Sequence, residues 1–100
     1  FRNTSATDTF TVTGDVSIGG TGKYNDDNVR TGADSFGSLT IADGGTYSAT
    51  SGTTTLTAVG GTSFNNNGTF THNNGLVKSS GDGGTTIRLQ TSTDFYNFEF

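Results

Sequence analysis

Short stretches of alternating hydrophobic and polar residues recur along the chain and predict β-strands. Apolar side chains lie two positions apart in Val16-Ser-Ile18, Leu39-Thr-Ile41, Tyr47-Ser-Ala49 and Ile87-Arg-Leu89. A period of two places the apolar residues on one face of a strand and their polar neighbours on the other. Helical periodicity is missing, and the abundant Gly, Thr, Ser and Asn are poor residues for helix interiors. We therefore expect an all-β protein.

The alternating stretches return with a fixed period, which four glycines mark. Gly14, Gly37, Gly60 and Gly83 lie 23 residues apart. A second phrase follows the first three of them, in Gly22-Lys-Tyr24, Gly45-Thr-Tyr47 and Gly68-Thr-Phe70. Such a period is typical of a solenoid, whose repeats bury their apolar faces only by stacking on one another. We predict a parallel β-helix that forms one domain over residues 1–100, with coils of about 14–36, 37–59, 60–82 and 83–100.

Stacking the repeats at this period predicts columns of equivalent side chains. Two columns come from one strand of each coil: Val16, Leu39 and Thr62, and Ile18, Ile41, Phe64 and Ile87. An aromatic column comes from a second strand: Tyr24, Tyr47 and Phe70. A third strand supplies a less regular column: Phe10, Ala33 and Leu56. We expect the core to consist of Val16, Ile18, Tyr24, Leu39, Ile41, Tyr47, Phe64, Phe70 and Ile87.

The polar residues between these columns are expected to face outward or to form corners. Ser17, Thr40, Ser63 and Thr86 are predicted to point away from the core. The four repeat glycines are predicted corners, as are residues 65–68 and 73–75, because Gly and Asn tolerate positive φ. Residues 91–100 break the period and are expected to form an end segment with its own register. An antiparallel β-sandwich or jelly roll remains an alternative, because short alternating strands with frequent turns fit it as well.

The composition narrows the classes of function. The 100 residues are 28 % hydrophobic with 16 glycines, which favours ordered β-structure around a thin core. Five dispersed basic residues and a net charge of −4 argue against nucleic acid, which requires clustered Lys and Arg. No apolar run reaches membrane-spanning length, so we expect no membrane insertion. The absence of cysteine excludes disulfides and thiolate metal sites.

Little in the chain indicates chemistry. His72 is the single histidine and is expected to be exposed, without a carboxylate at ligand spacing. Asp26, Asp27 and Asn28 form the densest group of oxygen ligands, but they lack the spacing of known calcium motifs and are interpreted as a solvated corner. No Gly-x-Ser-x-Gly elbow is present. We therefore predict no catalytic, cofactor-binding or metal-binding residues, no cofactor, and no enzymatic activity.

The last residues alternate aromatic and polar side chains: Tyr96, Phe98 and Phe100 are separated by Asn97 and Glu99. The open end of a solenoid exposes unpaired backbone groups, which must be capped or continued. We interpret this stretch as a candidate assembly strand. It either closes its own coil or pairs with a further coil or a neighbouring subunit by strand addition.

One part of the chain resembles known repeats. The phrase from Phe64 to Gly75, Phe-Asn-Asn-Asn-Gly-Thr-Phe-Thr-His-Asn-Asn-Gly, is followed by Thr93-Asp-Phe95-Tyr-Asn-Phe98. Together they resemble β-helix-type repeats of large secreted bacterial surface and adhesin proteins, and also segments of phage structural proteins. The resemblance covers roughly residues 37–100. It implies a β-helix with a structural or attachment role.

These observations lead us to expect a non-enzymatic structural and attachment module of an extracellular surface protein, a rigid β-rod that displays rows of Thr, Ser and Asn. The expected partners are other copies or other subunits of a surface or virion assembly, and glycans. One alternative is a virion structural protein of a phage, in capsid decoration or in a tail or fibre. Another is a carbohydrate-binding or depolymerase fragment, for which Asp15 and Asp43 are the acids on neighbouring coils.

Overall fold

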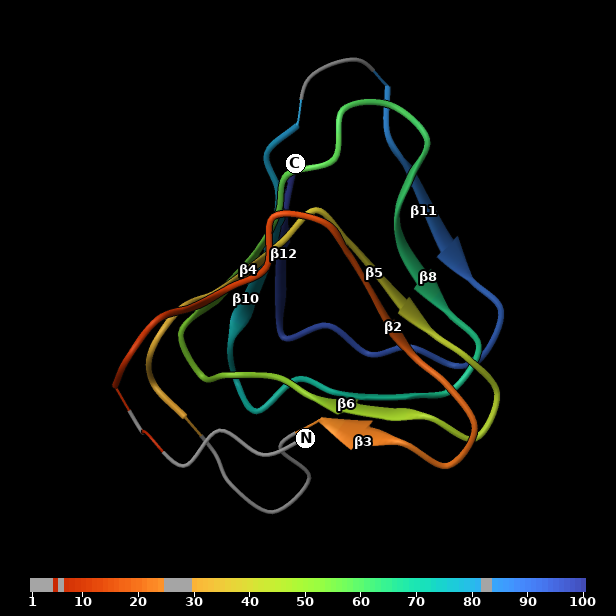
Figure 1. Ribbon diagram of the computed structural model, residues 1–100, viewed down its shortest axis with the longest axis horizontal. Helices are drawn as coiled ribbons and strands as arrows, with labels where there is room; N and C mark the ends of the chain where they lie inside the picture. The colour runs from red at the N-terminus through yellow and green to blue at the C-terminus, as the bar shows by residue number, and fades with distance from the viewer. Residues whose placement is uncertain (1–4, 6, 25–29, 82–83) are drawn as a thin grey trace.

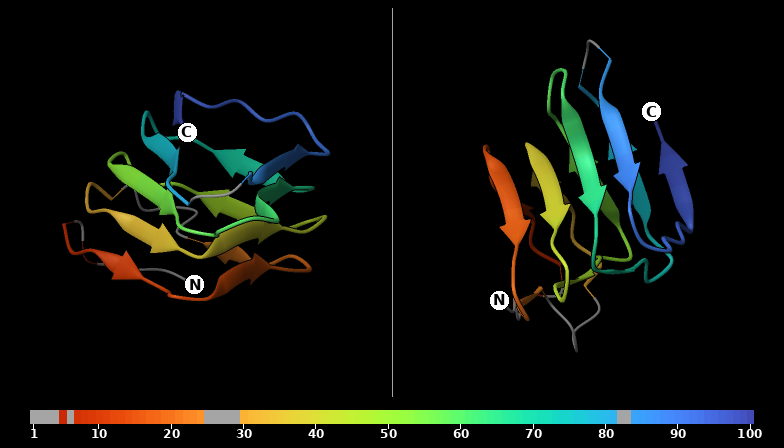
Figure 2. Two further views of the ribbon diagram at one scale, coloured as in Figure 1. Left: turned by 90° about the horizontal axis from the view of Figure 1, so that it is seen from above. Right: turned by 90° about the vertical axis from the view of Figure 1, so that its right-hand side faces the viewer.

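The structure, a computed structural model that describes residues 5, 7–24, 30–81 and 84–100, is a β-solenoid. The chain winds about four times around three sides of a triangle, which Figure 1 shows end-on. Figure 2 shows successive windings lying over one another, from the N-terminal winding to the C-terminal one. Every pairing between strands is parallel, and no helix occurs in the described part of the chain. The predicted β-helix is therefore confirmed, and the antiparallel sandwich is excluded.

Each side of the triangle is one parallel sheet. Sheet A contains β1 (Phe10–Thr11), β4 (Asp34–Phe36), β7 (Thr53–Leu56), β10 (Leu76–Ser79) and β12 (Asn97–Glu99). Sheet B contains β2 (Asp15–Ile18), β5 (Ser38–Ile41), β8 (Thr62–Asn66) and β11 (Thr86–Leu89). Sheet C contains β3 (Lys23–Tyr24), β6 (Thr46–Ser48) and β9 (Thr69–Thr71).

The core fills the inside of the triangle. Of the core residues expected from the sequence, seven are buried: Ile18, Tyr24, Leu39, Ile41, Tyr47, Phe64 and Phe70. Val16 and Ile87 are partly buried and pack against this cluster. The interior also contains four apolar residues outside the expected set, namely Phe36, Ala49, Leu56 and Val77. Burial of such side chains contributes about 1.5–3 kcal/mol each, so these few residues supply much of the stability of a thin core.

Sheet C keeps the 23-residue period through all three of its strands. Tyr24 pairs with Tyr47, and Tyr47 pairs with Phe70. The rings stack, with centroids 5.0 Å apart between Tyr24 and Tyr47 and 6.0 Å apart between Tyr47 and Phe70. The predicted aromatic column is therefore present, and its ring contacts add to the area that the side chains bury.

Sheet B keeps the period at first and then departs from it. Val16 pairs with Leu39 and Ile18 pairs with Ile41, as the 23-residue period predicts. In the next winding Leu39 pairs with Phe64, which is 25 residues further along the chain, and Ile41 pairs with Asn66. The two columns predicted here are therefore wrong beyond the second winding: Phe64 lies over Leu39 rather than over Ile41. The corner between β7 and β8 contains two residues with positive φ, Gly60 and Gly61, and this corner precedes the shift.

The shift also changes the direction of one polar side chain. Ser63 was expected to face outward with Ser17, Thr40 and Thr86, but it is fully buried. Its hydroxyl lies 3.3 Å from the hydroxyl of Ser79, which is also buried. The pairing of β8 with β11 is irregular at this point, between Thr86 and Ile87. Such a bulge leaves one residue without an opposite partner and turns its side chain to the other face of the strand.

Sheet A does not follow the period, and the column predicted for it is wrong. Phe10 pairs with Asp34 rather than with Ala33, and Leu56 pairs with Phe36. The chain advances 24 residues from Phe10 to Asp34, but only 20 from Asp34 to Thr54. It advances 23 from β7 to β10 and 21 from β10 to β12. The corners that lead into sheet A therefore differ in length from winding to winding.

The corners agree in part with those expected. Gly14, Gly37 and Gly60 lie between the strands of sheets A and B, whereas Gly83 is outside the described residues. Asn73 and Asn74 both have positive φ, and the amide of Asn73 donates hydrogen bonds to Ser48 and to the carbonyl of Ala49. Residues 65–68 are not a single corner, because the first two belong to β8 and the turn begins after them.

Candidate functional site

A buried polar network lies where the N-terminal windings meet. The guanidinium of Arg30 donates to Oδ1 of Asp34 at 2.5 Å, and both side chains are almost completely buried. The other carboxylate oxygen, Oδ2, accepts hydrogen bonds of 3.1 Å from the phenols of Tyr24 and Tyr47. Tyr47 also lies 3.1 Å from the hydroxyl of Thr54. The network thus joins the aromatic column of sheet C to two strands of sheet A.

Arg30 also holds the segment that precedes β1. Its Nε donates to the carbonyl of Ser5 at 2.9 Å, and its Nη2 donates to the carbonyl of Asp8. The guanidinium therefore neutralises the buried carboxylate and satisfies backbone acceptors at the same time, as a buried charge requires. No apolar pattern marks these residues in the sequence. The indirect signal was an Asp two positions before an aromatic residue that adjoins a repeat glycine.

The environment of the two phenols raises their pKa values. Burial is the main cause for Tyr24, because desolvation disfavours the charged phenolate, and the nearby Asp34 carboxylate raises its pKa further. Burial and then Asp34 likewise raise the pKa of Tyr47 well above its ordinary value. Both tyrosines therefore stay neutral and serve as hydrogen-bond donors to Asp34. This arrangement is that of a structural network, since neither phenol is prepared to lose its proton.

Each side of the solenoid displays a row of polar side chains, one from each strand. On sheet B the pairing of strands aligns Ser17 with Thr40, Thr40 with Asn65, and Asn65 with Arg88. We call these four residues the sheet B row. Neighbouring members are separated by the distance between strands, about 4.8 Å. The row is partly to fully exposed along its length.

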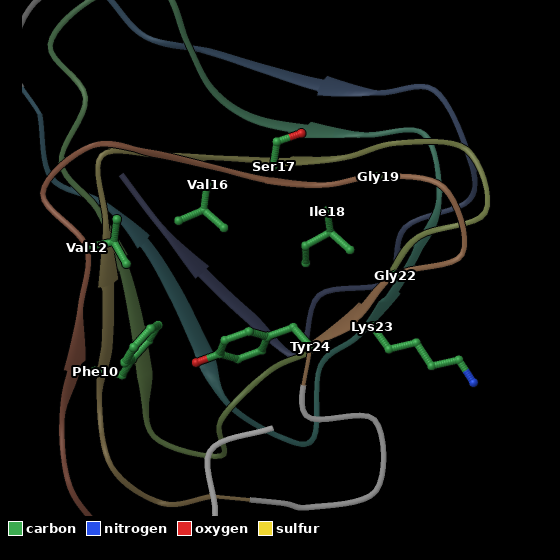
Figure 3. Close-up of a pocket in the computed structure, with 9 residues that line it drawn as sticks. All are labelled: Phe10, Val12, Val16, Ser17, Ile18, Gly19, Gly22, Lys23 and Tyr24. Atoms are coloured by element: carbon green, nitrogen blue, oxygen red, sulfur yellow. The ribbon is translucent and has the colours of Figure 1, made fainter. Parts of the chain in front are cut away.

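The N-terminal end of the solenoid is open. A cavity of about 310 Å³ lies there, as Figure 3 shows, and its apolar lining comes from the first winding alone. The apolar side chains that face it are Phe10, Val12, Val16, Ile18 and Tyr24. In the interior, the next winding covers the same residues on their other side. The cavity is therefore the place that one further winding would occupy.

The C-terminal end is partly closed by aromatic residues. Phe95 lies over the last ring of the aromatic column, with centroids 5.2 Å from Phe70 and 5.4 Å from Phe64. The expected assembly strand forms β12, which pairs with β10 and thus with its own chain. Phe98 packs on the core, whereas Tyr96 and Phe100 are 57 % and 75 % exposed. Residues 91–96 form no strand, so sheet C has no counterpart in the last winding.

The residues considered for chemistry are not brought together. His72 is half-buried; its Nδ1 accepts a hydrogen bond from the backbone of Asn74, and its ring lies 5.6 Å from that of Tyr96. The Asp15 carboxylate accepts a hydrogen bond from Ser38 at 2.8 Å. Residues 26–28 lie outside the described part of the chain. Within that part, no group of three His, Cys, Asp or Glu side chains is arranged to hold a metal ion.

Among the residues that the structure describes, none belongs to a helix long and apolar enough to cross a membrane. No protein-family model, no curated protein and no solved structure matches this chain. The functional argument therefore depends on the geometry of the chain itself: the sheet B row, the buried network and the two ends.

Proposed function

We propose that this chain is a non-enzymatic structural and attachment module of an extracellular surface, in which a stiff stack of windings displays polar rows to its surroundings. The sheet B row carries the proposal. It sets hydroxyl, amide and guanidinium groups in line on one sheet, with one group on every strand. Regular spacing of hydrogen-bonding groups suits a partner that itself repeats, such as a glycan polymer.

The interior supports the structural half of the proposal. Backbone hydrogen bonds join each winding to the next on all three sides, and the aromatic column and the buried ion pair tie several windings together. The rows therefore sit on sheets rather than on loops. Groups on rigid elements lose little conformational entropy on binding, which favours attachment through many weak contacts.

The attachment half is tested by immobilising the chain and passing neutral and acidic polysaccharides over it. We expect retention that is weakened when Thr40 and Asn65 are both replaced with alanine. Replacing Thr55 on sheet A with alanine is the matched control and should have little effect. Retention that is equal in the two variants would contradict the role of the sheet B row, and retention of no polysaccharide would contradict the glycan as partner.

The same experiment tests the absence of enzymatic activity. The polysaccharides are recovered after incubation and their chain lengths are compared with untreated samples. We expect no change. Shortened chains would contradict the proposal and favour a depolymerase fragment, the alternative in which acids of neighbouring windings act on a sugar chain.

One observation favours a second candidate, a structural protein of a virion. Three large apolar side chains are exposed at the C-terminal end: Leu89 is 49 % exposed, Tyr96 57 % and Phe100 75 %. Apolar groups gathered at one end suit contact with another protein subunit better than contact with sugars. Electron microscopy of particles that contain the chain separates the candidates, because a virion protein occupies repeated positions in an icosahedral or helical lattice.

A further inference from the structure

The first strand of sheet B has a free edge. β2 pairs with β5 on one side, and no other described strand pairs with it. The backbone amides of Gly37 and Ala42 donate to the carbonyls of Gly14 and Ile18. Since successive residues of a parallel strand turn their backbone groups to opposite sides, Gly14, Val16 and Ile18 face β5. The N–H and C=O groups of Asp15 and Ser17 therefore point to the free side.

An apolar surface lies directly beside this edge. The cavity at the N-terminal end is lined by Val16 and Ile18 of β2 and by Phe10, Val12 and Tyr24 of the neighbouring strands. On the covered side, Leu39 and Ile41 occupy the positions opposite Val16 and Ile18. An unpaired strand edge next to an apolar cavity has the elements of a site for strand addition, in which backbone bonds give affinity and side-chain pockets give specificity.

The internal windings show what kind of segment covers such a layer. The strands of sheet B that cover a winding present inward residues two positions apart, namely Leu39 and Ile41 on β5, and Ile87 and Leu89 on β11. The occupant of the free edge is therefore a strand parallel to β2 with apolar residues opposite Val16 and Ile18. Asp15 is exposed, so a basic residue opposite it completes the pattern: basic, apolar, polar, apolar.

A second copy of the chain does not fit this place. Sheet A ends with β12, one winding beyond β10, whereas sheet B ends with β11. If one copy placed its β2 against β11 of another, its β1 would fall on the position that β12 already occupies. The two ends of the molecule are out of step by one strand of sheet A. Head-to-tail stacking therefore requires the loss of β12, and the occupant is a strand of a different protein.

We propose that the free edge of β2 and the cavity beside it bind an extended segment of a partner protein, which adds as a parallel strand with the pattern basic, apolar, polar, apolar. Its two apolar side chains enter the cavity against Val16 and Ile18, and its basic side chain lies beside Asp15. This interaction is separate from the attachment role of the sheet B row, and its test does not depend on that role.

The probe is a fluorescent peptide copied from residues 37–48 with lysine in place of Ser38, because this sequence already covers Val16, Ile18 and Tyr24 from the other side. Binding to the full chain is followed by fluorescence anisotropy. We expect saturable binding that weakens at least tenfold with Ser17→Pro, which removes an N–H from the free edge and leaves the bonds to β5 in place. The matched control, Ser17→Thr, should bind as the native chain does.

A charge exchange tests the same register with a variant that leaves the backbone unaltered. Asp15→Lys should weaken binding of the lysine peptide and strengthen binding of a peptide with glutamate at that position. Leu89→Ser, at the opposite end of sheet B, should change neither. Circular dichroism establishes that each variant is folded.

The contrary results are equally specific. Absence of binding, equal binding by Ser17→Pro and Ser17→Thr, or loss of binding with Leu89→Ser would each overturn the proposal. Formation of dimers or filaments that Ser17→Pro abolishes would overturn it too, because the edge would then serve a second copy.

Discussion

Arg30 and Asp34 form an ion pair inside the solenoid, with 2.5 Å between Nη1 of the guanidinium and Oδ1 of the carboxylate. Each partner also has a second task. Arg30 binds the carbonyls of Ser5 and Asp8, and Asp34 accepts hydrogen bonds from Tyr24 and Tyr47. The pair therefore joins the segment before β1 to the aromatic column, and no single winding contains all of its contacts.

Removing the carboxylate charge should destabilise the fold strongly. Asp34→Asn leaves the Arg30 guanidinium buried without an opposite charge, and we expect the free energy of unfolding to fall by about 3–5 kcal/mol. Urea unfolding measures the loss. The control is Glu99→Gln, because the Lys78–Glu99 pair is exposed, with 3.7 Å between its charged atoms, and should contribute less than about 1 kcal/mol. Equal losses in the two variants would contradict a structural role for the buried pair.

Alkaline pH should weaken the fold through the two buried tyrosines. In the unfolded chain their phenols ionise near pH 10, whereas in the folded chain burial and Asp34 keep them neutral to higher pH. Stability from this source is complete below about pH 10 and is lost as the pH rises above it, by up to about 1.4 kcal/mol per pH unit for each tyrosine.

The measurement is urea unfolding at a series of pH values on either side of the phenol pKa. In the double variant Tyr24→Phe with Tyr47→Phe, the chain should be less stable at neutral pH, because Asp34 loses two hydrogen bonds. The fall in stability at alkaline pH should be smaller than in the native chain. If the double variant loses stability as steeply as the native chain does, the tyrosines are not the cause.

Two glycines of one column should respond differently to alanine, because only one of them has a winding beneath it. A Cβ at Gly37 would lie 2.8 Å from the carbonyl oxygen of Gly14, which is backbone and cannot move aside. A Cβ at Gly14 would meet nothing within 4 Å. We expect Gly37→Ala to cost roughly 1–3 kcal/mol and Gly14→Ala to be tolerated. Thermal unfolding compares them, and a similar loss in both would mean that the windings are not in close contact at this corner.

The period revealed the solenoid because sheet C and the first windings of sheet B keep it without change. Tyr24, Tyr47 and Phe70 stand at equal spacing in the sequence and in the structure alike. The fold class and most of the buried residues could therefore be predicted from the pattern of glycines, alternating residues and aromatics. Here each corner has the same length, so position in the repeat gives position in space.

Sheet A could not be predicted because corner length is not constant there. Phe36 is fully buried, yet the residues 23 positions before and after it are Thr13 and Val59, and Val59 is 75 % exposed. Only the 20-residue advance from β4 to β7 brings Phe36 beside Leu56. A fixed period therefore conceals this part of the core.

The candidate site was predicted less well, for a related reason. Arg30 and Asp34 are two charged residues in a corner, and such residues are expected to face water. Their burial follows from contacts with Ser5 and Asp8, which arrive from a distant part of the chain. The cavity was also invisible in the sequence, because it arises where a covering winding is missing and not from any motif.

The direct test of stacked windings uses pairs of introduced cysteines in this cysteine-free chain. Thr40 and Asn65 are opposite each other on neighbouring strands of sheet B, at a spacing of about 4.8 Å that a disulfide can bridge. Thr40→Cys with Asn65→Cys should therefore cross-link on mild oxidation. Thr40→Cys with Ser63→Cys, the pair that an unbroken 23-residue period would place together, should remain reduced because Ser63 faces inward. Cross-linking of the second pair alone, or of neither, would contradict the stacking described for these windings.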